Sequence, residues 1–204
     1  MSFYDKNFKE YIENTKYCDM STQYLFFEKH LKKNSETILD IGFGSCRDMI
    51  HFKEKGYDVF GIDPTKAFYD YALSLGFCNV FCMSVQQLEL QNMFDGIWAC
   101  ASLIHVNKEE LNDVFKKCSK ALTKDGVIYC SFKYGDFSGV RSERYFIDLN
   151  EISIKKYLVG TDLYLNDFCI TKDVRLDRLD DKWLNVILKQ VTNYNNKNVN
   201  RQES

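Results

Sequence analysis

The chain has 204 residues, of which 45% are hydrophobic and 27% are charged, and its formal net charge is -2. This composition is typical of one globular domain and excludes a disordered or fibrous protein. It also disfavours a nucleic-acid-binding protein, because neutralising phosphates usually requires an excess of basic residues.

The cysteine spacing and the hydropathy of the chain indicate the cellular compartment in which the protein works. No apolar run approaches the ~20 residues that a membrane span requires, and the first residues do not resemble a signal peptide. The eight cysteines are scattered without any C-x-x-C pair, and the three histidines form no zinc pattern with them. We therefore expect a reduced, cytoplasmic protein without a membrane segment or a structural metal.

The predicted elements begin with helices and then alternate. Helical spacing of aromatic residues predicts two amphipathic helices within residues 1–35, with Ser21 as a cap of the second. The following elements are a strand at 37–41, a helix at 46–55, a strand at 57–62, a helix at 65–75, strands at 79–83 and 94–100, a helix at 108–122 and a strand at 127–132. Gly56 and Gly76 are expected to end two of these helices. Such alternation predicts βαβ units and a mainly parallel sheet.

The alternation stops after residue 132. Residues 133–144 hold glycine, serine and charged residues, which predicts a mobile loop. A helix near 150–158 and two strands at 163–172 and 182–191 follow, and strands so close in sequence are expected to pair as an antiparallel hairpin at the sheet edge. Residues 193–204 are rich in asparagine and are expected to be disordered. Residues 1–192 would then form a single domain, with 1–35 as a helical lid.

A glycine-rich loop between the first strand and the first helix is the strongest local motif. Gly42 and Gly44 let the backbone approach a ligand at the carboxyl end of the strand. The dinucleotide-binding fingerprint is incomplete, because Arg47 and Asp48 stand where a third small residue is expected. Taken alone, the loop could equally be a tight structural turn.

Asp63 strengthens this motif, because it ends the second strand 23 residues after Asp40. A carboxylate at this point can accept hydrogen bonds from both hydroxyls of an adenosine ribose. The alternative is a turn residue before Pro64, since Asp-Pro also begins helices. The joint occurrence of the glycine loop and the acid favours ribose binding.

These residues resemble the class I S-adenosylmethionine-dependent methyltransferases. The resemblance rests on the segments 39–48 (LDIGFGSCRD), 61–64 (GIDP), 94–106 (FDGIWACASLIHV) and 121–127 (ALTKDGV). It spans roughly residues 19–191 and is closest to small bacterial methyltransferase-domain proteins related to the tellurite-resistance type. It implies a Rossmann-like three-layer α/β sandwich with a mainly parallel seven-stranded sheet, an antiparallel edge hairpin and N-terminal covering helices.

The resemblance also implies a cofactor, S-adenosyl-L-methionine, and a position for it. The loop 42–44 would pass under its methionine part, Asp63 would hold its ribose, and residues 83–85 would border its adenine. The expected cofactor-binding residues are Asp40, Gly42, Phe43, Gly44, Arg47, Asp63, Pro64, Met83, Ser84, Val85, Ala99, Cys100 and Ala101. Two residues depart from the family pattern: Cys46 stands where glycine is usual, and Ser84 replaces an acid near the adenine amine.

The methyl acceptor is expected to be a small molecule that reacts through oxygen, nitrogen or a soft sulfur, selenium or tellurium centre. His105, just past the fourth strand, is the candidate general base, although it could instead satisfy a neighbouring loop. Lys133, Arg141, Arg144 and Arg175 suit the recognition of a carboxylate or phosphate, which predicts an anionic acceptor, although solvated surface charge is the default. The expected substrate residues are Tyr11, Lys133, Tyr134 and Arg144.

Two other functions stay open at this point. A nicotinamide-dependent oxidoreductase has the same layered architecture, but the missing third glycine and the edge hairpin disfavour it. A protein that binds S-adenosylmethionine or S-adenosylhomocysteine without turnover is compatible with Cys46 and Ser84. The sequence identifies neither the acceptor nor the oligomeric state.

Overall fold

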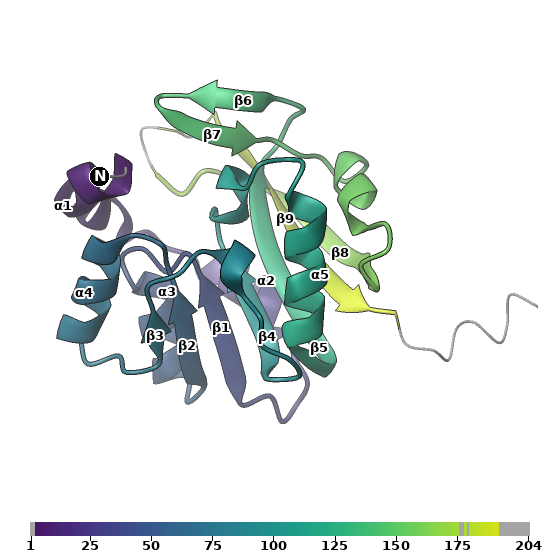
Figure 1. The fold of residues 1–204 in the computed structure, drawn as a ribbon, viewed down its shortest axis with the longest axis horizontal. Coiled ribbons are helices and arrows are strands. Elements are labelled where there is room, and N and C mark those ends of the chain that lie inside the picture. Colours follow the sequence, from purple (N-terminus) through teal and green to yellow (C-terminus); the bar gives the residue numbers. More distant parts are fainter. Residues whose placement is uncertain (1–2, 176–177, 179, 192–204) are drawn as a thin grey trace, which may run out of the picture.

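Seven strands form one sheet in the order β3-β2-β1-β4-β5-β9-β8 in this computed structural model, which describes residues 3–175, 178 and 180–191. The parallel strands are β1 (Thr37–Ile41), β2 (Asp58–Ile62), β3 (Val80–Phe81), β4 (Phe94–Ala99) and β5 (Leu122–Lys133). Antiparallel β9 (Lys182–Gln190) pairs with β5, and β8 (Leu163–Lys172) pairs with β9 at the edge (Figure 1). The predicted Rossmann-like sheet and its edge hairpin are therefore confirmed. The tail expected over 193–204 lies outside the described residues.

Helices cover both faces of this sheet. One face packs against α1 (Phe3–Thr15), α2 (Ser21–Glu28), α3 (Arg47–Glu54) and α4 (Lys66–Ser74), and the other against α5 (Leu111–Ala121). Figure 1 shows α5 on the near face and α2 behind the sheet. The described residues also include three short 3-10 helices: η1 (Val85–Gln87), η2 (Leu103–His105) and η3 (Ser153–Leu158). No helix in the described part of the chain is both long enough and apolar enough to cross a membrane.

The period-two pattern of β5 explains how the two cores form. Val127 and Tyr129 point into the core under α1–α4, whereas Ile128 and Cys130 point into the core under α5. All four side chains are buried, as expected for a central strand that is covered on both faces.

The segment 133–144, predicted as a mobile loop, is instead ordered. It contains β6 (Ser138–Arg141), which pairs in antiparallel fashion with β7 (Arg144–Ile147) in a separate two-stranded sheet. Ser142 and Glu143 form the turn with φ of 46° and 64°, the left-handed geometry of a two-residue hairpin. The sequence conceals this hairpin because Ser-Glu replaces the usual Asn-Gly.

Two smaller expectations were wrong. The helix expected near 150–158 is the shorter 3-10 helix η3. Ser21 makes no side-chain cap, because it is already the first residue of α2, and its backbone N–H donates to the carboxylate of Asp19 at 2.9 Å. Asp19 therefore satisfies the helix N-terminus that Ser21 was expected to satisfy.

A buried carboxylate fixes the N-terminal helices to the sheet. Asp48 of α3 accepts hydrogen bonds from the Tyr24 hydroxyl of α2 at 2.5 Å and from the Trp98 indole of β4 at 2.9 Å. Arg47 donates to the same carboxylate through Nε at 2.7 Å and Nη2 at 2.9 Å. Four donors thus surround one charge, which satisfies the condition under which a buried ion pair is tolerated.

We expect Asp48→Ala to lower the free energy of unfolding by about 3–5 kcal/mol, because it removes the counter-charge of a largely buried guanidinium and leaves the buried Tyr24 and Trp98 donors without this acceptor. Chemical denaturation checks this. Asp70→Ala is the matched control: it breaks only the solvent-exposed ion pair with Lys66 and should change stability little. Equal losses in the two variants would contradict a central role for Asp48.

Candidate functional site

The glycine loop adopts a backbone conformation that requires its glycines. Gly42 has φ of 74°, and a Cβ there would lie 2.6 Å from the Cβ of Ser102. Gly44 has φ of 47° and lies against the ring of Tyr11, which a Cβ would approach to 3.0 Å. The loop can therefore pass close to the lid helix and to the end of β4 only with glycine at both positions.

The side chain of Asp63 is hydrogen-bonded to this loop. Its carboxylate accepts the N–H of Gly44 at 3.1 Å through one oxygen and the N–H of Thr65 at 2.8 Å through the other. Burial raises the pKa of Asp63, although both hydrogen bonds oppose the rise. Each carboxylate oxygen keeps a further lone pair, so the side chain can also accept hydroxyls from a ligand.

Cys46, the departure from the family pattern, sits in a conformation that favours glycine. It precedes α3 with φ of 59° and ψ of 12°, in the left-handed region, and its side chain is fully buried. A residue with a Cβ is disfavoured there, which is in line with the glycine that the resemblance implies at this position. The thiol packs into the core under α1–α4, and burial raises its pKa above the usual range.

Beside the glycine loop lies a cavity of about 300 Å³, here called the glycine-loop cavity. Among the residues expected to bind the cofactor, eight line it: Gly42, Gly44, Asp63, Pro64, Met83, Ser84, Val85 and Ala101. Five do not. Asp40, Phe43 and Ala99 are buried in the protein interior, while Arg47 and Cys100 line a second cavity.

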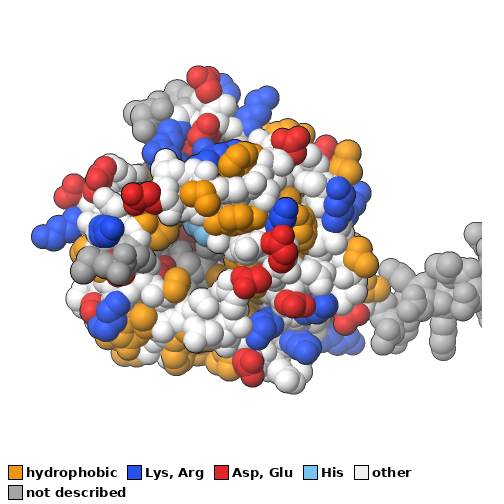
Figure 2. All heavy atoms as spheres, turned by 45° about the horizontal axis from the view of Figure 1, so that its top comes forward, with side chains coloured by type: hydrophobic (Ala, Val, Ile, Leu, Met, Phe, Trp, Pro, Cys, Tyr) orange, Lys and Arg blue, Asp and Glu red, His pale blue; other side chains and the backbone are white. Residues whose placement is uncertain are grey.

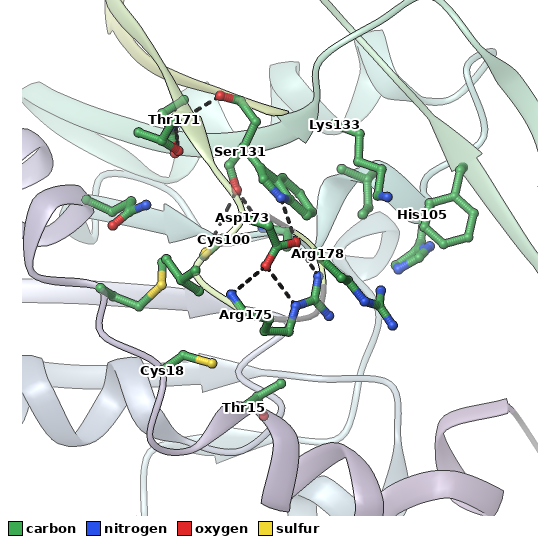
Figure 3. Close-up of a pocket in the computed structure, with 18 of the residues that line it drawn as sticks. Thr15, Cys18, Cys100, His105, Ser131, Lys133, Thr171, Asp173, Arg175 and Arg178 are labelled. Atoms are coloured by element: carbon green, nitrogen blue, oxygen red, sulfur yellow. Dashed lines mark hydrogen bonds and ion pairs between the residues drawn. The ribbon is translucent and has the colours of Figure 1, made fainter. Parts of the chain in front are cut away.

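The second cavity, of about 260 Å³, is here called the arginine cavity. Its walls include the expected substrate residues Tyr11, Lys133 and Arg144, together with Arg141, Arg175 and Arg178. Tyr134 lies outside both walls and donates its hydroxyl to Glu151 at 3.2 Å. Figure 2 shows this end of the molecule hollowed, with Lys and Arg side chains above the hollow. In Figure 3, Lys133 and His105 lie on one side of the arginine cavity, and Thr15 and Cys18 lie at another.

Four residues line both cavities and so form the wall between them: Tyr4, Tyr11, Ala101 and His105. Tyr4 and Tyr11 come from α1, Ala101 follows β4, and His105 ends η2. A group that lies in one cavity can therefore meet a group in the other only at this wall.

His105 is held in one tautomer. Its Nδ1 lies 2.8 Å from the carbonyl oxygen of Tyr145, which can only accept, so Nδ1 carries the proton. Its Nε2 lies 2.8 Å from the Tyr4 hydroxyl and accepts that hydrogen bond. The Tyr4 oxygen in turn accepts a hydrogen bond from Nη1 of Arg144 at 2.9 Å. A continuous chain thus runs from Arg144 through Tyr4 to His105.

Burial and, to a smaller extent, the charge of Arg144 lower the pKa of His105 to about 4, although the Tyr145 carbonyl opposes the shift. The imidazole is therefore neutral at neutral pH. Burial raises the pKa of Tyr4, and Arg144 opposes that rise, so the phenol keeps its proton. His105 is therefore a neutral base, and a proton can reach the lone pair on its Nε2 only through the Tyr4 hydroxyl that is hydrogen-bonded to it.

Sequence reasoning missed several lining residues. Tyr4, Ser102 and Gln23 were assigned no site role, yet they line one or both cavities. Ser102 and Gln23 each have a buried polar atom without a hydrogen-bond partner among the described residues. The two glycines gave an indirect signal for Ser102, because a glycine at position 42 indicates that another side chain lies close to the loop. Neither periodicity nor spacing in the sequence indicates a site role for Gln23. No group of three or more His, Cys, Asp or Glu in the described ranges could hold a metal ion.

Protein stability should depend on pH through His105. The unfolded chain takes up this proton near pH 6.5 and the folded chain only near pH 4, so the free energy of unfolding should fall as pH decreases through this window, by about 3 kcal/mol at its lower end. His105→Asn keeps a donor for the Tyr145 carbonyl but does not titrate, and should lose less stability between pH 6.5 and 4 in chemical denaturation. Parallel curves for the variant and the wild type would show that His105 is not a buried neutral base.

Comparisons with known proteins agree with this fold. Residues 38–126 match the methyltransferase domain family. No curated protein matches the chain. One similar crystal structure is the 1,6-didemethyltoxoflavin-N1-methyltransferase of Burkholderia thailandensis with bound 1,6-didemethyltoxoflavin and S-adenosylhomocysteine. It is 18% identical, covers 93% of this chain and 86% of that chain, and has a TM-score of 0.75.

Two further structures share the fold. A SAM-dependent methyltransferase from Methanosarcina mazei is 16% identical over 82% of this chain and 98% of that chain, with a TM-score of 0.71. The (4+2)-cyclase SpnF is 12% identical over 92% of this chain and 93% of that chain, with a TM-score of 0.70. The relation to the tellurite-resistance type stays a prediction. Residues 38–126 thus resemble the methyltransferase domain family, and the chain as a whole has the fold of these S-adenosylmethionine-dependent methyltransferase structures, as its motifs predict.

Proposed function

We propose that this protein is an S-adenosylmethionine-dependent methyltransferase that acts on a small-molecule acceptor. The observation that supports this most directly is the pair of cavities that meet at Tyr4, Tyr11, Ala101 and His105. In this proposal the glycine-loop cavity holds the cofactor, the arginine cavity holds the acceptor, and methyl transfer takes place across the shared wall.

The residues of the glycine-loop cavity fit an S-adenosylmethionine. Asp63 directly follows β2, and its carboxylate has acceptor capacity to spare, as two ribose hydroxyls require. The Ser102 hydroxyl is buried on the cavity wall without a partner among the described residues, and such a group is satisfied when a polar ligand binds. The Burkholderia structure, which contains S-adenosylhomocysteine, supports the same cofactor.

When bound, the cofactor supplies a methyl group on a positively charged sulfonium. The protein's own contribution is then chiefly to hold the acceptor in line and to keep water out. Tyr4 and Tyr11 of α1 form part of the wall between the cavities, and in this proposal they keep water out.

His105 is proposed as the base where the acceptor must lose a proton. Its Nε2 is already occupied by the Tyr4 hydroxyl, so the acceptor's proton passes to the Tyr4 oxygen while the Tyr4 proton passes to Nε2. Tyr4 is unchanged at the end of this exchange, and the imidazole becomes cationic. Because His105 is a weak base in this site, the route suits an acceptor that turns strongly acidic once methylated, such as a hydroxyl.

Two alternatives are tested by the same experiment. The first is a protein that binds the cofactor without turnover, because Cys46 occupies a position suited to glycine, and because the fold also occurs in a (4+2)-cyclase. A nicotinamide-dependent enzyme is the second alternative. Binding of each cofactor, measured before any acceptor is known, separates the oxidoreductase from the other two functions.

We expect isothermal titration to show binding of S-adenosylhomocysteine and S-adenosylmethionine but not of NAD. Asp63→Asn should weaken S-adenosylhomocysteine binding about tenfold or more, because it removes the charge from a hydrogen-bond acceptor. Asp58→Asn, an exposed site at the other end of β2, is the control and should bind like the wild type.

Binding of NAD alone would overturn the proposal. Binding of S-adenosylhomocysteine, with no release of this product from S-adenosylmethionine in a broad acceptor screen, would favour the protein without turnover. The amide of Asp63→Asn has only one oxygen to accept the N–H groups of Gly44 and Thr65, so this substitution could also affect folding. Thermal unfolding of the variant distinguishes a loss of binding from a loss of fold.

A further inference from the structure

The basic side chains of the arginine cavity are not equivalent. Lys133 is paired with Asp181 at 2.6 Å, and Arg141 is bonded twice to Asp148, at 3.1 and 2.7 Å. Neither of these carboxylates lines the cavity. Arg175 is bonded to Asp173 at 2.9 and 2.5 Å, as the dashed lines in Figure 3 show. These three cations are therefore already neutralised by the protein.

Arg144 differs from them. Among the described residues no carboxylate pairs with it; Nη1 donates to the Tyr4 hydroxyl, and Nε is buried without any acceptor. Its guanidinium lies over aromatic rings, 4.4 Å from the centroid of Phe3 and 5.0 Å from that of Phe146. The rings fix the orientation of the guanidinium plane but do not satisfy its N–H groups. A positive charge with an unused buried donor thus lines the cavity.

Gln23 is a second unsatisfied group on the same cavity, and it comes from a different element. It lies on α2, is only 6% exposed, and lines the arginine cavity. Its Oε1 is buried without a partner in the described part of the chain. A buried amide oxygen without a hydrogen bond costs stability. A ligand with a donor and an acceptor side by side would satisfy it.

Aromatic side chains are part of the remaining wall, beside polar ones such as Ser131 and Asn185. Tyr4, Tyr129, Phe146 and Trp183 line the cavity along with these two polar groups. Aromatic walls favour flat, apolar faces in a ligand.

We propose that the arginine cavity binds a flat, anionic molecule that carries an amide-type edge, an N–H beside a C=O. Arg144 binds the anionic group and Gln23 pairs with the edge. The identification of this molecule as the methyl acceptor rests on the proposed function, whereas its binding does not.

Three probes separate the two contacts. Orotate is flat and carries both a carboxylate and imide edges; uracil has the edges without the carboxylate; benzoate has a carboxylate without the edges. Titration calorimetry on the full chain, with and without saturating S-adenosylhomocysteine, should rank orotate as the tightest binder. Loss of a charge-assisted bond corresponds to about tenfold in affinity, and loss of a neutral one to about threefold to tenfold.

The variants give a matched set. Arg144→Gln should weaken orotate and benzoate about tenfold or more and leave uracil within about twofold. Gln23→Leu should weaken orotate and uracil about threefold to tenfold and spare benzoate, and it should not lower the melting temperature, because it removes an unsatisfied buried amide. Gln23→Met replaces it if the leucine variant does not fold. Lys182→Gln removes a charge from the start of β9, outside the cavity, and should leave all three affinities unchanged.

The outcomes are distinct. If S-adenosylhomocysteine binds but orotate has no advantage over uracil and benzoate, or Arg144→Gln affects all three probes alike, this inference is wrong and the proposed function stands. If the probes behave as expected but S-adenosylhomocysteine does not bind, the proposed function is wrong and the ligand class stands. If Lys182→Gln and Arg144→Gln lowered the affinity for the anionic probes equally, the loss would reflect the net charge of the protein and not a contact with Arg144, which would overturn the role of Arg144.

Discussion

Both cavities depend on the buried charge of Asp48. Burial opposes ionisation of this carboxyl, but the Arg47 guanidinium and the hydrogen bonds from Tyr24 and Trp98 outweigh it and lower its pKa. The resulting ion pair joins α2, α3 and β4, and the Nη1 of Arg47 also donates to the carbonyl of Thr15 at the end of α1. Breaking this ion pair would weaken the contacts of both the lid helices and the core, because Arg47 donates hydrogen bonds to Thr15 of the lid and to Asp48 of the core.

The same charge governs the neighbouring acid. Burial raises the pKa of Asp40 well above its usual range, and the negative charge of Asp48 raises it further. Of these two buried carboxyls, one on β1 and one on α3, the donors lower the pKa of Asp48, whereas burial and repulsion raise the pKa of Asp40. A second link, from the Thr15 hydroxyl to that of Ser45 at 3.0 Å, joins the lid directly to the glycine loop. The loop, the lid and the ion pair therefore form one connected unit.

The sequence predicts the glycine-loop cavity well because this cavity is built locally. Gly42, Gly44 and Asp63 act through backbone geometry and through a bond between residues 19 positions apart, and such spacings recur in a readable pattern. The strands around them are buried on both faces and were identified by apolar runs. The β6–β7 hairpin escaped notice because its left-handed turn is made by Ser142 and Glu143, a pair that lacks the usual turn signal.

The arginine cavity could not be predicted in this way, and the reason is physical. Its decisive property is which polar groups lack a partner, and that is known only once every other group has been paired. Arg141 and Arg144 are indistinguishable in the sequence, three residues apart in one hairpin, yet Asp148 neutralises the first and leaves the second to the cavity. Gln23 reads as an ordinary polar position of an amphipathic helix until its burial is known. Unpaired buried groups reduce stability, and the ligand that we propose for this cavity would satisfy both of them.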